Sequence, residues 1–94
     1  MDFDQKIYEE KSELLKVLAH PVRLCIVRGL MEHENCNVTY MKDCLKTSQS
    51  AMSQHLAKLK AANIVKCVRS GNNIYYKLTD RRLEKLIKDL FEKN

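Results

Sequence analysis

Residues that interrupt helices are scarce in this chain of 94 residues. Gly29 and Gly71 are its only glycines, and Pro21 is its only proline. Because these two residue types are the strongest breakers of regular structure, their scarcity predicts a mostly helical protein. The length fits one domain, residues 1–94, and a domain of this size buries too little surface to be very stable by itself.

Apolar residues recur at the three- and four-residue spacing of helices in five segments. Pro21 ends the first segment, because the residue before a proline avoids helical geometry, and it suits the first turn of the second. Asn37 and Ser48 can cap the third and fourth segments, and Thr79 or Asp80 can cap the last. The expected helices cover about residues 5–19, 21–31, 38–45, 49–62 and 80–93.

Only the segment before the last helix has the pattern of β-strands. Residues 64–69 (IVKCVR) and 74–78 (IYYKL) are rich in β-branched and aromatic residues, and residues 70–73 (SGNN) have turn chemistry. Tyr75 and Tyr76 should point to opposite faces of this hairpin, one into the core and the other half exposed. Four helices, a hairpin and a final helix make a winged helix-turn-helix, a mainly α fold with a small β-hairpin.

Charge is distributed unevenly along the chain, whose formal net charge is +5. Residues 1–19 hold five acidic residues and three lysines, a net charge of −2. No acidic residue occurs between Asp43 and Asp80, and this stretch holds six basic ones. It predicts a surface that faces a polyanion such as DNA; a solvated basic surface without a partner is the alternative. The six are Lys46, Lys58, Lys60, Lys66, Arg69 and Lys77.

The outward positions of the fourth expected helix carry polar side chains with hydrogen-bonding groups. Met52, Leu56 and Leu59 are expected to face inward, which leaves the polar residues outside. Such groups hydrogen-bond to base edges and phosphates, and basic residues of a wing contact the minor groove or backbone. The predicted contacts with double-stranded DNA are Ser48, Gln49, Ser50, Ser53, Gln54, His55 and Lys58 of the helix, and Lys66, Arg69 and Asn73 of the hairpin.

Three segments of the chain resemble a known family, the ArsR/SmtB-type transcriptional repressors. They are residues 18–24 (LAHPVRL), 48–59 (SQSAMSQHLAKL) and 74–78 (IYYKL), and they follow the family's order and spacing. The resemblance implies a homodimer built from the first and last helices, residues 5–19 and 80–93. It also implies binding to a palindromic operator and release by an inducer. The apolar faces of both helices exceed what one small core needs, which agrees with a dimer.

The best-known sensing sites of that family are missing from this chain. The Cys-x-Cys metal motif falls on Asn37 and Thr39, and residues 80–94 contain no histidine for the metal site of the last helix. The second-helix cysteine of thiol-sensing relatives falls on Arg28, and the last helix has no cysteine. No metal ion and no cofactor are therefore expected.

The four cysteines are expected to be free thiols in the cytoplasm, because the start of the chain does not resemble a secretion signal. Cys25 lies on an apolar stripe and is expected to be buried and inert. A thiol switch formed by Cys36 and Cys44, responsive to oxidant or a soft metal, is an open hypothesis. His20 is expected to be structural, and His55 is expected to lie on the surface of its helix.

The sequence predicts a regulator of transcription, a repressor, that binds an inverted-repeat operator as a dimer. A winged helix that contacts a protein and binds no operator is the alternative, but such proteins tend to lose the basic face. An enzyme is not expected, because a cysteine nucleophile needs a base and a pocket that this short helical chain does not build. No apolar run approaches the roughly 18 residues of a membrane span, so no membrane contact is expected.

Overall fold

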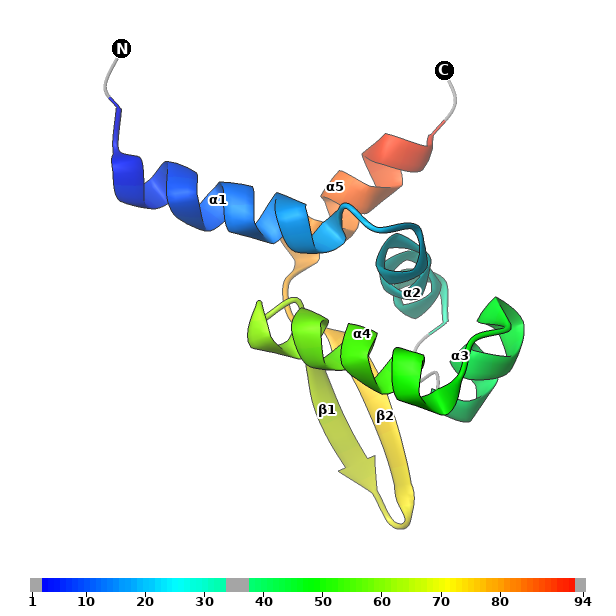
Figure 1. Ribbon diagram of the computed structural model, residues 1–94. Helices are drawn as coiled ribbons and strands as arrows, with labels where there is room; N and C mark the ends of the chain where they lie inside the picture. Colours follow the sequence, from blue (N-terminus) through cyan, green and yellow to red (C-terminus); the bar gives the residue numbers. More distant parts are fainter. Residues whose placement is uncertain (1–2, 34–37, 93–94) are drawn as a thin grey trace.

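The computed structural model describes residues 3–33 and 38–92 of the chain. Within these residues, five helices and a two-stranded antiparallel hairpin follow one another in the order that the sequence predicts (Figure 1). The fold is a winged helix-turn-helix, mainly α with one small sheet. The elements are α1 (Gln5–Leu18), α2 (Pro21–Glu32), α3 (Val38–Leu45), α4 (Gln49–Ala61), β1 (Val65–Ser70), β2 (Asn73–Leu78) and α5 (Arg81–Phe91).

Polar side chains just before the helices explain where most of them begin. Asp4 caps α1, Ser48 caps α4 and Asp80 caps α5, each by accepting a hydrogen bond from a backbone N–H of the first turn. At α2 the cap is His20, whose Nδ1 accepts from the N–H of Val22 at 3.1 Å. These caps satisfy N–H groups that have no partner within the helix, and they confirm a structural role for His20.

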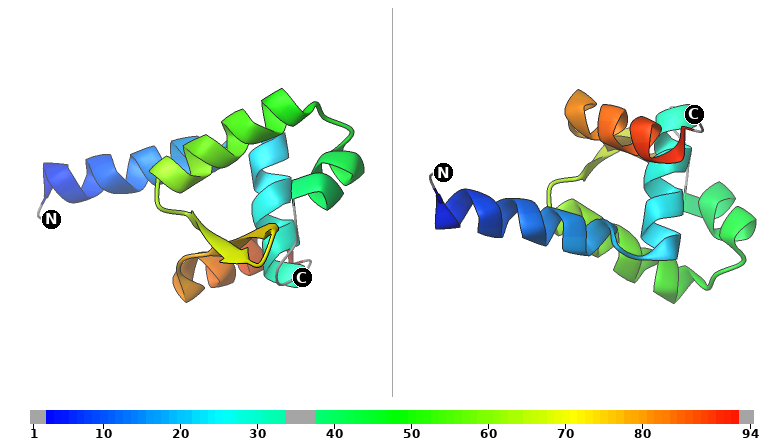
Figure 2. Two further views of the ribbon diagram at one scale, coloured as in Figure 1. Left: turned by 90° about the horizontal axis from the view of Figure 1, so that it is seen from below. Right: turned by 90° about the horizontal axis from the view of Figure 1, so that it is seen from above.

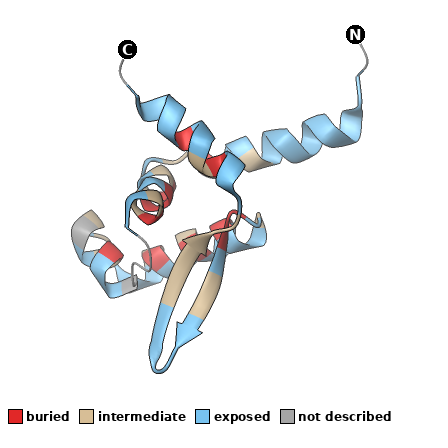
Figure 3. Cartoon of the chain, turned by 180° about the vertical axis from the view of Figure 1, so that it is seen from behind, coloured by how far each residue is buried: buried red, intermediate tan, exposed pale blue. Residues whose placement is uncertain are grey.

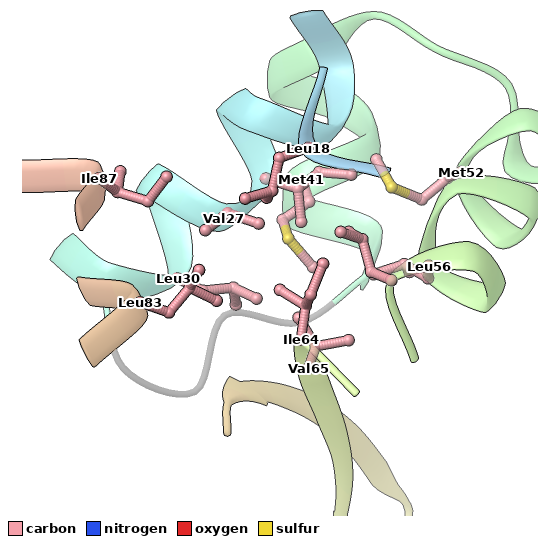
Figure 4. Close-up of a cluster of buried hydrophobic side chains, with 12 residues drawn as sticks. Leu18, Val27, Leu30, Met41, Met52, Leu56, Ile64, Val65, Leu83 and Ile87 are labelled. Atoms are coloured by element: carbon pink, nitrogen blue, oxygen red, sulfur yellow. The ribbon is translucent and has the colours of Figure 1, made fainter. Parts of the chain in front are cut away.

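Helix α2 lies at the centre of the hydrophobic core and contacts α1, α4, α5 and β2. Its buried residues Arg23, Ile26, Val27 and Leu30 follow the spacing of one helix face. Figure 4 shows side chains from all five helices and from β1 gathered around this face. The buried apolar residues include the three predicted in α4; they are Leu18, Ile26, Val27, Leu30, Met41, Met52, Leu56, Leu59, Ile64, Val65, Leu83 and Ile87.

The hairpin of β1 and β2, here called the wing, has a tighter turn than the sequence predicts. Its strands pair from Val65 with Leu78 out to Ser70 with Asn73, so that two residues form the turn. Gly71 in this turn has a φ of +62°, in the left-handed region where glycine carries no side-chain penalty. The wing therefore projects as a regular two-stranded ladder up to its tip.

Two sides of the molecule differ in which elements they present. Helices α1 and α5 lie on one side, and α4 and the wing lie on the other (Figure 1). Figure 2 shows α2 crossing between them, from the end of α1 to α5. Most of α1 and the tip of the wing are exposed (Figure 3). In the part of the chain that the structure describes, no helix has the length and apolar character to cross a membrane.

Two of the predicted core side chains are less buried than expected. Cys25 is exposed, and the prediction that this thiol is buried is wrong, because the buried face of α2 is centred on Ile26 and Val27. Tyr75 and Tyr76 are both half-buried; Tyr76 packs against the core, as expected for one of the two, but it is not completely buried. The cause is that only the base of the wing packs against the core, while its outer half stands in solvent.

The proposed thiol switch falls where the structure gives no description. Asn37, the predicted cap of α3, and Cys36 lie outside the described residues, and the side chain of Cys44 is not described either. The switch therefore stays a prediction, which operator binding by reduced and oxidised protein would test. The two described cysteines, Cys25 and Cys67, are free thiols.

Candidate nucleic-acid interface

A tight turn joins α3 to α4. Helix α3 ends where Lys46 adopts a left-handed φ of 51°, and the N–H of Thr47 donates to the carbonyl of Lys42 at 3.2 Å. Ser48 then begins α4, and its Oγ accepts from the N–H of Ala51 at 3.0 Å. Only three residues separate the two helices, as the helix-turn-helix arrangement requires.

Ser48→Ala is expected to lower the free energy of unfolding by about 1 kcal/mol, because the first turn of α4 loses its acceptor. Urea denaturation followed by circular dichroism measures this change. Ser53→Ala is the control, since Ser53 is exposed inside the same helix and alanine favours helix there. Equal losses in both variants would show that the cap does not hold the start of α4.

The first two turns of α4 present an open polar face. Gln49, Ser50, Ser53 and Gln54 are exposed, whereas Met52 between them is completely buried. The unpaired N–H groups and the dipole at the start of a helix favour an anion in front of it. The structure therefore brings four of the predicted contacts together at an exposed helix end that suits phosphate and base edges.

A cleft of about 560 Å³ lies between α4 and the wing. Gln49 and Ser53 line it from α4, and Asn73 lines it from the wing. The cleft also includes Thr39 from α3, which was not among the predicted contacts because no local pattern relates it to the wing. Three of the predicted residues thus share one cleft, together with a threonine that only the tertiary structure places there.

The predicted basic contacts are exposed, but they do not line this cleft. Lys66 and Arg69 lie on β1, and Lys58 of α4 lines a separate hollow between α4 and α1 that is also lined by acidic residues of α1. The basic residue of α4 that lines the cleft is Lys60. In the ladder of the wing, Lys66 stands opposite Lys77 of β2. Like charges directly opposite each other destabilise a strand pair, and a phosphate beside them would relieve this repulsion. The wing therefore carries cations in positions that an anionic backbone would stabilise.

His55 has an environment unlike that of the other predicted contacts. Its ring is half-buried against α2, with Nδ1 at 3.3 Å from Nη1 of Arg23 and the ring centroid 4.6 Å from that of His20. Burial lowers the pKa of His55, and the charges of His20, Arg23 and Lys58 lower it further. His55 is more covered than the prediction of a surface residue implies, because Arg23 offers a partly buried donor that draws the imidazole inward.

Arg23 is a residue whose part in this site the sequence did not reveal. It is 9% exposed, and its Nε donates to the carbonyl of Val17 at the end of α1. The sequence signal that could have revealed it is its spacing: Arg23 lies three residues before Ile26 and four before Val27, on the buried face of α2. A charged residue at such a position needs internal partners, and Arg23 finds them in α1 and α4.

An arginine occupies the position that corresponds to one sensing residue of the family. Arg28, the position at which the resemblance places the cysteine of thiol-sensing relatives, lies 4.2 Å above the ring of Phe91 and pairs with Glu32 at 3.4 Å. The contact with Phe91 joins α5 to α2 through a cation and an aromatic ring, whereas the ion pair with Glu32 lies within α2. Among residues 3–33 and 38–92, no cluster of three or more histidine, cysteine or carboxylate side chains could hold a metal ion.

The chain is similar in sequence to known regulators of transcription. Residues 18–68, from the end of α1 into β1, match a family described as "Helix-turn-helix domain". The transcriptional repressor PagR of Bacillus anthracis is 44% identical over 80 residues, which cover 85% of this chain and 80% of PagR. The HTH-type transcriptional repressor SmtB of Mycobacterium tuberculosis is 41% identical over 85 residues, which cover 90% of this chain and 62% of SmtB.

Solved structures of related proteins have the same fold. The crystal structure of PagR superposes with a TM-score of 0.82 at 41% identity, covering 93% of this chain and 99% of PagR. The transcriptional repressor BigR of Xylella fastidiosa superposes with a TM-score of 0.80 at 31% identity, covering 96% of this chain and 94% of BigR. With the exposed recognition surface of α4 and the wing, these similarities show that the chain belongs to the ArsR/SmtB-type family of winged helix-turn-helix, DNA-binding transcription regulators.

Proposed function

We propose that this protein represses transcription by binding an inverted-repeat operator as a homodimer. The start of α4 enters the major groove, and the wing lies against the flanking backbone or minor groove. The exposed start of α4 carries the proposal, because four polar side chains surround free helix N–H groups within an acid-free segment. The relatives PagR and SmtB are named transcriptional repressors, which supports repression and action on DNA in the cytoplasm.

Some side chains of α4 suit contacts with bases, and others suit contacts with phosphates. The amides of Gln49 and Gln54 each have donors and an acceptor, which suits the paired groups on the edge of adenine. The hydroxyls of Ser50 and Ser53 are short and can pair with either a base or a phosphate. Ser48 keeps the helix start ordered, so that its N–H groups point at a phosphate.

Exposed basic side chains of α4 and the wing contact phosphates. Lys58 neutralises the backbone beside α4, while Lys66 and Arg69 do so along β1. Asn73 lines the cleft, where its amide can hydrogen-bond to the DNA backbone between the major and minor grooves. His55 makes no base contact in this proposal, because its Nδ1 is turned to Arg23.

Exposed apolar side chains on α1 and α5 supply the surface for a second copy of the chain. Among the described residues, seven of the nine large apolar side chains that are exposed lie on these helices or just before α1. A two-fold partner would remove this patch from water. Residues 1–19 carry a charge of −2, whereas α5 has four basic and two acidic residues, which favours contact between α1 and the partner's α5. The seven are Phe3, Ile7, Tyr8, Leu15, Leu86, Leu90 and Phe91.

A dimer formed on this side leaves both copies of α4 free on the other side (Figure 1). Two such helices fit half-sites about one helical turn of DNA apart, roughly 34–36 Å. Selection from a library of randomised duplexes tests the proposal, and the enriched sequences should share an inverted repeat. Enrichment of an unrepeated site, or of no sequence, would contradict it.

Gln54→Ala is expected to weaken binding to the selected operator by about 1–3 kcal/mol and to leave binding to unrelated DNA nearly unchanged. The reason is that an amide contact to a base edge is lost while the phosphate contacts remain. Fluorescence anisotropy with both duplexes at one salt concentration measures the two affinities. Gln5→Ala on α1 is the matched control, and an equal loss on both duplexes would show that Gln54 does not contact a base.

A further inference from the structure

One side chain, Arg23, connects the recognition helix α4 to α2 and α1. Arg23 projects from α2, donates from Nε to the carbonyl of Val17 in α1, and places Nη1 at 3.3 Å from Nδ1 of His55 in α4. His55 follows Gln54 directly, so its ring lies within one turn of the exposed face of α4. The position of that face therefore depends on the hydrogen bond between His55 and Arg23.

The hydrogen bonds at this junction require neutral imidazoles. A guanidinium has donors and no acceptor, so Nδ1 of His55 must offer a lone pair to Arg23. Nδ1 of His20 likewise accepts from the N–H of Val22 at the start of α2. A proton on Nδ1 of His55 would place a donor against a donor. Protonation of His55 therefore removes the acceptor that joins α4 to α2.

The charged and titratable groups next to His55 all oppose its protonation. From α2 these groups are Arg23 and His20, and from α4 itself the group is Lys58. Partial burial of the ring is the largest cause of its lowered pKa. For a histidine whose pKa is lower when folded, stability is complete above the unfolded value of about 6.5 and is lost as the pH falls toward the folded value. Acidification therefore disrupts the contact between His55 and Arg23 in the folded protein.

We propose that Arg23 is a positioning residue for the recognition helix, and that protonation of His55 releases this helix and weakens operator binding. This inference rests on the proposed function and adds to it a response to pH that the family's sensing sites do not supply. Contacts to base edges need the side chains of α4 in one fixed position, whereas phosphate attraction tolerates movement. Acidification therefore lowers the affinity for the operator and spares the affinity for unrelated DNA, to which an added positive charge contributes attraction.

The test compares affinities at about pH 7.5 and pH 5.5, on both sides of the histidine range, at constant ionic strength. For the unmodified protein, the ratio of operator affinity to affinity for unrelated DNA should fall by about fivefold or more in acid, the size of a typical coupling between sites. His55→Gln keeps an acceptor for Arg23 but cannot titrate, so its ratio should stay constant. His33→Gln changes the remaining histidine, which is exposed outside this junction, and should respond to acid as the unmodified protein does.

A second measurement does not involve DNA. The titration of the His55 ring, followed by NMR, should have its midpoint below 6.5, and Arg23→Met should raise that midpoint by removing the adjacent charge. Loss of packing would also raise the midpoint by exposing the ring, so the NMR chemical shifts of residues outside the junction should match those of the unmodified protein. A midpoint that stays in place in Arg23→Met would overturn the assignment of Arg23.

The outcomes separate this inference from the proposed function. If no operator is bound at about pH 7.5, the proposed function fails, and the ring titration still decides whether Arg23 and His55 interact. If the operator is bound but His55→Gln loses affinity in acid as the unmodified protein does, the pH response does not come from His55 and the inference is wrong.

Discussion

Leu90→Glu is expected to convert the protein to monomers and to weaken operator binding by at least about 100-fold. Leu90 is 63% exposed on α5, so a charge there leaves the fold of one chain intact. In the proposed dimer the same position is buried, and two-fold symmetry places the charge in the interface twice. Burying a carboxylate without a partner costs several kcal/mol, and the operator needs both copies of α4.

Light scattering measures the mass, and fluorescence anisotropy measures the operator affinity. Lys88→Gln is the matched control, because it lowers the net charge of α5 by one unit, as Leu90→Glu does, at a polar exposed position. The control should remain dimeric and bind DNA nearly as the unmodified protein does, because it only reduces the charge attraction between α1 and α5 and buries no unpaired carboxylate. A dimeric Leu90→Glu variant would show that the exposed face of α5 is not the interface.

Raising the salt concentration from about 50 mM to 200 mM is expected to lower DNA affinity by about 1,000-fold. The acid-free segment holds six basic residues, and a dimer therefore holds twelve. If half of them contact phosphates, the logarithm of affinity falls with the logarithm of salt with a slope of about −5. Anisotropy titrations at four or five salt concentrations measure this slope, and a slope near zero would contradict a phosphate-facing surface.

Substitution of Arg69 tests whether the wing is part of this phosphate-facing surface. Arg69→Gln should make the slope shallower by about 2, because each copy in the dimer loses one phosphate contact on the wing. Lys6→Gln removes the same charge from the exposed start of α1, on the other side of the molecule, and should leave the slope nearly unchanged. Equal slopes for the two variants would place the wing away from the backbone.

The order of the elements could be predicted because its causes are local. Pro21 marks the boundary between α1 and α2, Gly71 marks the turn of the wing, and Ser48 and Asp80 cap the helices that follow them. Each of these residues acts on neighbours within four positions in the chain. The exposed polar face of α4 was predictable for a similar reason, because the buried apolar residues of one helix fix its rotation.

The junction around Arg23 could not be predicted from local patterns. Its partner in α4, His55, is 32 residues away, and the choice of an inward orientation depends on a buried donor that no periodicity reveals. Cys25 illustrates the same limit, since its exposure depends on which side of an apolar helix the neighbouring helices cover. Thr39 entered the cleft only because α3 and the wing meet in three dimensions.

Helix α1 has one buried residue, Leu18, among its 14 residues, and it projects from an elongated molecule. The radius of gyration is 14.2 Å, whereas a compact chain of this length has a value of about 12 Å. A helix of this length is marginal in water without packing, so in the proposed dimer folding and association are linked by mass action. The temperature of unfolding should then rise with protein concentration, and the amount of protein in a cell would govern how much of it is folded as well as how much DNA it occupies.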